Sequence, residues 1–130
     1  MAARFDAVGI IVEDMERSLA FYGLLGFEIP ADARQQGHVE LHLARGLRLL
    51  IDTVEVIQSF SDWQPPAGGH RMGLAFLCDS PAGVNDQHAA IVQAGYRSHV
   101  DPFDAPWGQR YATVLDPDGN PVDLFAPLTP

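Results

Sequence analysis

The chain opens with an apolar run followed by a helical pattern. Residues 5–12 are apolar and β-rich and predict a strand, and Asp14 stands directly before the helical pattern, as its N-cap. The side chains that recur at helical spacing, and that would pack one helix face against a sheet, are Met15, Leu19 and Tyr22. Gly26 is expected to end this helix, because glycine readily adopts the left-handed conformation of helix C-termini.

More strands are predicted in the rest of the first half. Residues 27–30 predict a short strand and residues 31–37 a polar loop. Residues 38–44 and 47–53 predict two further strands, joined by a tight turn at residues 45–46. These elements would build one small sheet.

A segment rich in proline and glycine separates the two halves. Residues 54–69 are expected to be irregular, because Pro65 and Pro66 lack amide donors and two glycines follow them. We therefore take residues 54–70 as the link between two modules, with Trp63 in a stiff loop.

The second half repeats the order of the first. Residues 72–78 predict a strand, Ser80 and Pro81 the N-cap and first residue of a helix, and Gly95 the end of that helix. Its apolar stripe is Val84, His88 and Ile91.

A hairpin closes the chain. Residues 109–115 and 121–125 predict two strands, joined by Asp-Pro-Asp-Gly at residues 116–119. Pro106 precedes Trp107, which we place at the mouth of this hairpin. The hairpin register is open by one residue, and a slip would exchange Tyr111 for its neighbours on the cleft side.

The two halves match locally. The matched pairs are residues 9–12 with 73–76, residues 25–27 with 94–96, and the turns at Gly46 and Gly119. We predict an α+β fold of two βαβββ modules, about residues 4–53 and 71–127. One module alone leaves a sheet face uncovered, so the two mixed sheets are expected to curl around a shared cleft.

Chain length and net charge limit the classes of function that the protein could have. The chain has 130 residues, which suits one domain, and 17 acidic against 8 basic residues give a net charge of −9. This charge disfavours nucleic-acid binding and favours a neutral or cationic small molecule. No signal peptide or membrane-spanning run is visible, so we expect a cytoplasmic protein that does not bind membranes.

Catalytic motifs are weak. The lone Cys78 lies in an apolar strand and is expected to be a buried hydrophobe, and no nucleophile elbow or phosphate loop is present. His38, Glu40 and His42 would share one strand face and could bind zinc or iron, but a strand with one polar face gives the same spacing. His88 is expected to be a core histidine, and His70 and His99 exposed loop residues.

The closing hairpin and the repeat resemble the vicinal-oxygen-chelate superfamily, which includes glyoxalases, extradiol dioxygenases, fosfomycin-resistance enzymes and bleomycin-type drug-binding proteins. The resemblance implies metal-ligand positions on equivalent strands, and here these are Ala7, Leu50, Gly73 and Asp123. Three of these side chains have no donor atom, and one carboxylate cannot hold a catalytic metal that needs about three protein ligands. We therefore predict no metal and no other cofactor.

Residues 38–55, 63–65, 68–71, 107–112 and 122–128 are similar to the mitomycin-binding proteins of the bleomycin-resistance group. This similarity implies a metal-free homodimer that holds an antibiotic in a cleft, stacked on aromatic side chains. We predict a protein without catalytic residues that sequesters a planar, quinone-like or cationic drug. The residues expected to bind it are Trp107, Trp63, Tyr111, Phe103, His38, Asp52, Gln109 and Asp123.

Two alternatives stay open. The chain could be a lyase, isomerase or dioxygenase with a relocated metal at His38, Glu40 and His42, which would be sensitive to EDTA. It could also be a carrier whose cleft docks a biosynthetic enzyme, which would then co-purify with it.

Overall fold

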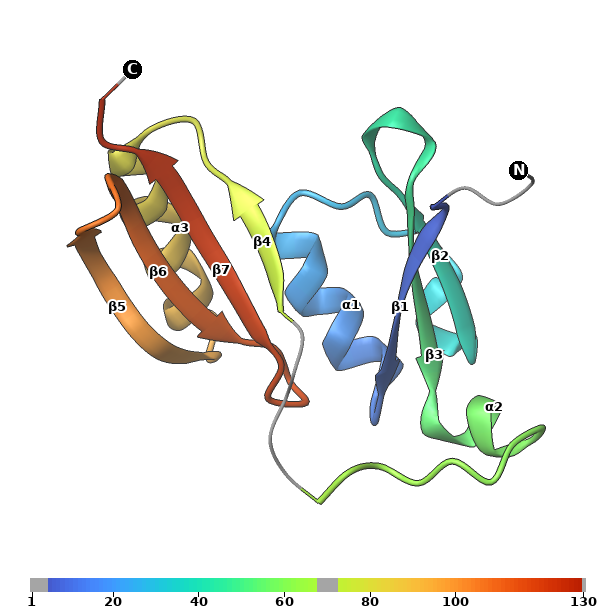
Figure 1. Cartoon of the computed structure of the whole chain (residues 1–130). Helices are drawn as coiled ribbons and strands as arrows, with labels where there is room; N and C mark the ends of the chain where they lie inside the picture. The colour runs from blue at the N-terminus through green and yellow to red at the C-terminus, as the bar shows by residue number, and fades with distance from the viewer. Residues whose placement is uncertain (1–4, 68–72, 130) are drawn as a thin grey trace. The chain divides into compact units, whose positions relative to one another are not determined.

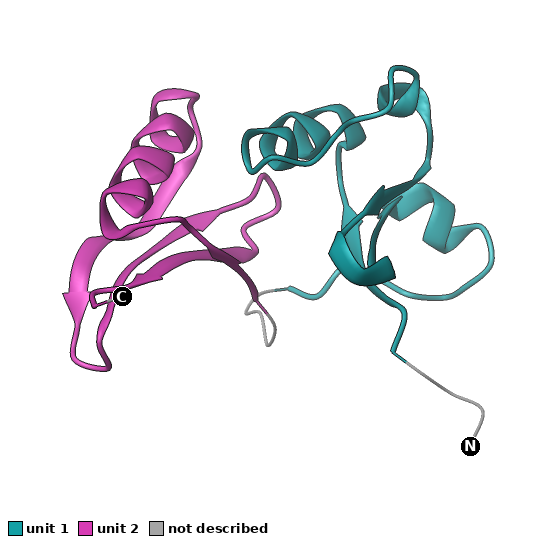
Figure 2. Ribbon diagram, turned by 90° about the horizontal axis from the view of Figure 1, so that it is seen from above, with its two compact units in different colours: residues 1–67 teal, residues 68–130 magenta. Residues whose placement is uncertain are grey.

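The computed structural model describes residues 5–67 and 73–129, and the chain divides into two compact units, residues 1–67 and 68–130. Figure 2 colours the two units separately, and each is described here by itself. Among the described residues, no helix is both long enough and apolar enough to cross a bilayer.

The first unit holds a three-stranded mixed sheet (Figure 1). Its elements are β1 (Ala7–Val12), α1 (Met15–Leu24), η1 (Ala33–Gln35), β2 (His38–His42), η2 (Ala44–Gly46), β3 (Arg48–Thr53) and α2 (Val54–Gln58). The central strand β3 pairs in parallel with β1 and antiparallel with β2. The buried side chains of this sheet are Val12, Val39, Leu41, Leu49 and Ile51.

The predicted helix ends of both units are confirmed. The Asp14 carboxylate accepts a hydrogen bond from the Arg17 amide at 3.0 Å, and the Ser80 hydroxyl accepts one from the Gly83 amide at 3.0 Å. Gly26 and Gly95 follow the two helices with φ of 97° and 100°, which an L side chain rarely adopts. Local sequence therefore fixes where α1 and the later helix start and stop.

Two predictions for the first unit are wrong. Residues 27–30 form no strand, because Pro30 has no amide to donate and its carbonyl instead accepts from the Ala33 amide, which begins η1. The first unit is thus βαββ in its described part, not βαβββ. Residues 54–58, expected to be irregular, form α2, whose first turn is capped by the Thr53 hydroxyl.

The second unit is βαβββ, as predicted (Figure 1). Its elements are β4 (Leu74–Leu77), α3 (Pro81–Gln93), β5 (Arg97–Ala105), β6 (Gln109–Leu115) and β7 (Pro121–Pro127). The sheet order is β4-β7-β6-β5, with β4 parallel to β7 and the other pairs antiparallel. The buried side chains on the face toward α3 are Val122, Leu124, Ala126, Ala112 and Val114.

The opposite face of this sheet, which we call the open face, carries the alternate residues of each strand. They include Tyr111, Thr113, Asp123 and Phe125. Arg110 points the other way, since its Nε donates to the Asn85 side chain of α3 at 3.0 Å. The register left open by the sequence is therefore set with Tyr111 on the open face.

The two halves do repeat each other as predicted, but the predicted match of residues 9–12 with 73–76 is shifted by two residues. Counting back from the caps Asp14 and Ser80, Gly9 corresponds to Ala75 and not to Gly73. The ladders agree, because Gly9 lies opposite Leu50 and Ala75 lies opposite Asp123. Leu50 and Asp123 are therefore equivalent positions of the two sheets, as the superfamily resemblance implied.

The turn between β6 and β7 depends on one buried carboxylate. Asp116 is 4% exposed, and its oxygens accept from the Asp118 and Asn120 amides at 2.9 and 2.8 Å and from the Asn120 side chain at 2.9 Å. These contacts close the predicted Asp-Pro-Asp-Gly turn and hold the hairpin that carries Asp123.

We predict that Asp116→Ala lowers the free energy of unfolding by about 2 kcal/mol in urea denaturation, because it leaves part-buried amides without their acceptor. Asp62→Ala, at an exposed loop carboxylate, is the control and should cost less than about 0.5 kcal/mol. Equal losses in the two variants would show that the Asp116 contacts do not hold the turn.

Candidate functional site

Three aromatic rings meet at the end of the β5–β6 pair. The ring centroids of Trp107 and Tyr111 are 5.3 Å apart, those of Phe103 and Trp107 6.1 Å, and those of Phe103 and Tyr111 6.3 Å. The interplanar angles are 83°, 88° and 76°, so each pair is edge-to-face. We call these three residues the aromatic corner.

Backbone geometry explains how the corner forms. Phe103 lies opposite Tyr111 in the β5–β6 ladder, so both rings point to the open face. Gly108, with φ of 90°, closes the tight connection by donating to the Ala105 carbonyl at 3.0 Å, which brings Trp107 back over the strands. Trp107 remains 58% exposed, so much of its ring is accessible within this unit.

A row of hydroxyls and a carboxylate adjoins the corner. Asp123 of β7 accepts from the Tyr111 hydroxyl at 2.5 Å and from the Thr113 hydroxyl at 2.7 Å. Burial, and next the hydrogen bond to Asp123, raise the pKa of Tyr111 to about 12. The phenol is therefore protonated at neutral pH and acts as a donor to the carboxylate.

The structure brings five of the eight predicted ligand-binding residues together on the open face. The predicted residues in this group are Phe103, Trp107, Gln109, Tyr111 and Asp123. Gln109 takes part because its side-chain oxygen accepts from the Trp107 indole N–H at 2.9 Å. Thr113, which lies directly opposite Asp123 in the β6–β7 ladder, was missed because the sequence left the hairpin register open by one residue.

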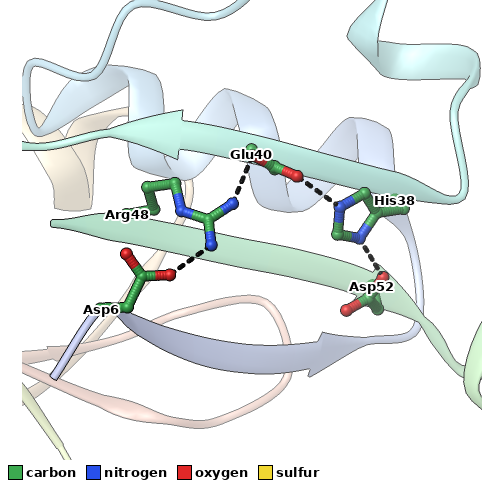
Figure 3. A network of polar contacts seen from close by, with 5 residues as sticks. All are labelled: Asp6, His38, Glu40, Arg48 and Asp52. Atoms are coloured by element: carbon green, nitrogen blue, oxygen red, sulfur yellow. Dashed lines mark hydrogen bonds and ion pairs between the residues drawn. The ribbon is translucent and has the colours of Figure 1, made fainter. Parts of the chain in front are cut away.

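His38 and Asp52 lie in the first unit, on the polar face of its sheet (Figure 3). His38 contacts Asp52 Oδ1 through Nδ1 at 2.6 Å and Glu40 Oε2 through Nε2 at 3.2 Å. Arg48 pairs with the other Glu40 oxygen at 2.6 Å and with Asp6 at 2.5 Å. These five side chains form a row of alternating charge, which we call the charge row.

The remaining predicted residue, Trp63, is partly exposed in the loop after α2, where its amide donates to the Ser61 hydroxyl at 3.0 Å. Trp63 belongs to the first unit, whereas the aromatic corner belongs to the second. The ligand-binding roles of all eight residues stay predictions.

The other histidines are mostly as expected. His88 is largely buried and its Nε2 lies 2.8 Å from the Ser98 hydroxyl, as predicted for a core histidine with a partner. His99 is exposed, but it lies in β5 and not in a loop. His70 and the start of the predicted strand 72–78 lie outside the described residues. Cys78 is half-buried, and burial, followed by Asp79, raises the pKa of its thiol.

The residues at the implied metal positions do not fit a metal. Ala7 and Leu50 offer no donor atom, Gly73 has no side chain, and both Asp123 oxygens already accept from hydroxyls. Glu40, in the alternative set with His38 and His42, has one oxygen on Arg48 and one facing His38. Within residues 5–67 and 73–129, no group of three or more His, Cys, Asp and Glu side chains could hold a metal ion.

The charge row makes a pH-dependent contribution to stability. The contacts with Asp52 first, and with Glu40 second, raise the pKa of His38 above 6.5. Because the folded-state pKa is raised, the stabilisation is fully present below the unfolded pKa and is lost as the pH rises through the folded pKa.

We predict that an NMR titration gives a pKa for His38 above 6.5, and that Asp52→Asn moves it down toward 6.5. The difference in unfolding free energy between the wild type and Asp52→Asn should be largest at acidic pH and shrink at alkaline pH. A pKa that Asp52→Asn leaves unchanged would contradict this account of the contact.

Comparison with known proteins places this geometry in a family. Residues 4–124 match the sequence model of the Glyoxalase/Bleomycin resistance protein/Dioxygenase superfamily. No curated protein matches the chain.

Solved structures show the same fold at low sequence identity. A hypothetical protein from S. aureus aligns with TM-score 0.80 and 18% identity, over 97% of this chain and 95% of its own. A glyoxalase/bleomycin resistance protein/dioxygenase family enzyme from Burkholderia phytofirmans aligns with TM-score 0.80 and 21% identity, over 97% and 100%. A lactoylglutathione lyase from Agrobacterium tumefaciens aligns with TM-score 0.66 and 19% identity, over 97% and 94%. With its matched sequence and its two mixed sheets, the chain belongs to the glyoxalase/bleomycin resistance protein/dioxygenase superfamily.

Proposed function

We propose that this chain is a metal-independent binding protein that sequesters a small molecule, an antibiotic of planar, quinone-like or cationic type, without transforming it. The single observation that carries this proposal is the aromatic corner, in which Trp107 is 58% exposed beside two partly buried rings. The indole is held by a tight turn and lies against two further rings, and a contiguous exposed apolar group commonly marks a binding site.

Stacking and apolar burial are the two contributions to affinity that the corner offers. Each aromatic contact contributes about 0.5 to 1.5 kcal/mol beyond burial, and burial contributes about 25 cal/mol per Å² of apolar surface. Micromolar binding corresponds to about 8 kcal/mol. A conjugated ligand on Trp107 and Tyr111 would gain both contributions against the cost of its lost translational and rotational freedom, and neither contribution requires a metal.

The Asp123 carboxylate and the Tyr111 and Thr113 hydroxyls, which we call the polar row, would orient the ligand. Asp123 uses one acceptor site of each oxygen for Tyr111 and Thr113, and each carboxylate oxygen has further lone-pair capacity. A ligand N–H or O–H can therefore be added to this row without breaking it. In this proposal the hydroxyls hold the carboxylate in place and the rings provide most of the affinity.

The contacts of the carboxylates in the charge row support a binding function rather than metal-dependent catalysis. Its carboxylates face cationic or hydrogen-bonding side chains, so a metal ion at His38 and Glu40 would have to displace Arg48. The homodimer, the shared cleft and the cytoplasmic location stay predictions.

We predict that a cognate compound from a panel of intercalating and DNA-damaging antibiotics quenches tryptophan fluorescence, and that Trp107→Ala weakens its binding by about tenfold or more. Phe60→Ala, which removes an exposed aromatic side chain of the first unit, is the matched control and should leave the affinity unchanged. Unchanged affinity in Trp107→Ala would remove this ring from the site.

We also predict that EDTA changes neither the affinity nor the fate of the bound compound. Mass spectrometry of the compound recovered after prolonged incubation should return its original mass. Turnover that EDTA abolishes would instead support the metal-dependent lyase, isomerase or dioxygenase alternative.

A further inference from the structure

The three rings of the aromatic corner stand nearly at right angles to one another, in edge-to-face pairs. Their interplanar angles are 76° to 88° and their centroid spacings 5.3 to 6.3 Å. Trp107 is 58% exposed, so part of its ring is accessible to a ligand beside the other two rings. A cation placed over an accessible aromatic face is attracted within about 6 Å of the ring centroid.

Hydrogen bonding makes two of these rings more electron-rich. The Tyr111 hydroxyl donates to Asp123 at 2.5 Å, and the Trp107 indole N–H donates to Gln109 at 2.9 Å. A ring that donates its polar hydrogen to an acceptor gains electron density, and the negative potential of its face grows. The Asp123 carboxylate adds a full negative charge next to Tyr111.

The neighbouring cation does not occupy this corner. Arg110 follows Gln109 in β6, but alternation places it on the α3 face, where it binds Asn85 at 3.0 Å and Asp104 at 3.0 Å. The net charge of −9 also favours a cationic ligand over an anionic one.

We propose that the corner of Phe103, Trp107 and Tyr111 is a subsite for a compact organic cation, a methylated or quaternary ammonium group carried by the ligand. This inference rests on the proposed function in taking the open face as the ligand-binding face, and it selects the cationic class among the ligands considered. A quinone oxygen, which is an acceptor, would meet the electron-rich faces and the carboxylate unfavourably.

Choline and its uncharged isostere 3,3-dimethylbutan-1-ol test the inference, because they share shape and differ in charge. The readout is the indole N–H resonance of Trp107 in the full-length protein, assigned with Trp63→Phe, with sodium chloride added to equal ionic strength. We expect choline and tetramethylammonium to shift this resonance saturably, and the isostere to bind about tenfold more weakly or worse.

Two variants of Tyr111 distinguish the contribution of its ring face to binding from an effect on folding. Tyr111→Phe keeps a ring and should retain most choline binding, whereas Tyr111→Leu should lose about tenfold, with both proteins checked for an unchanged amide spectrum elsewhere. Equal loss in both variants would overturn a role for the ring face.

The outcomes also separate this inference from the proposed function. If choline and the isostere bind equally, or if neither shifts Trp107 while an uncharged planar antibiotic does, the cation subsite is wrong and small-molecule binding stands. If no antibiotic and no ammonium compound shifts Trp107, both proposals fail.

Discussion

The antiparallel register of β6 and β7 is the constraint on which the site depends. In this register Thr113 lies opposite Asp123 and Val114 opposite Val122. Residues directly opposite each other share one sheet face, so the same pairing buries valines against α3 and places a hydroxyl beside a carboxylate. A slip of one residue would turn the buried apolar side chains to the open face and the polar side chains toward α3. Such a slip would expose the hydrophobic core. Core and site are therefore specified together.

Local signals in the sequence were enough to predict the two long helices and the closing hairpin. The caps at Asp14 and Ser80, the glycine stops at Gly26 and Gly95, and the closing hairpin all follow from side-chain hydrogen bonding or φ preference within a few residues. The expected strand at residues 27–30 failed because a strand exists only with a partner. Whether a ladder partner is available depends on the tertiary fold and not on the segment itself.

The repeat shows a similar limit. Matching glycines aligned Gly9 with Gly73, yet the helix caps and ladders align Gly9 with Ala75. Counting from the helix N-cap aligns the two halves better than matching glycines does, because the position of the N-cap is fixed by a side-chain hydrogen bond. For the site, the sequence indicated the aromatic residues and Asp123. It indicated His38 and Asp52 separately but not their contact, because that contact depends on the exact register of β2 against β3.

Two polar arrangements with different chemistry result. The charge row of the first unit satisfies its own charges, as each carboxylate in it faces a histidine or an arginine. The open face of the second unit instead presents an exposed indole, two electron-rich rings and a carboxylate with lone-pair capacity remaining. The second arrangement has accessible contact area and remaining acceptor capacity, which a ligand requires, and this is why we propose it as the binding site.

The most direct test of this assignment is a map of amide chemical-shift changes when an antibiotic that binds is added to EDTA-treated protein. Our account predicts changes concentrated between Phe103 and Phe125, on the strands that carry Trp107, Tyr111 and Asp123. Changes centred instead on His38 to Asp52, or appearing only after a divalent metal is restored, would contradict it.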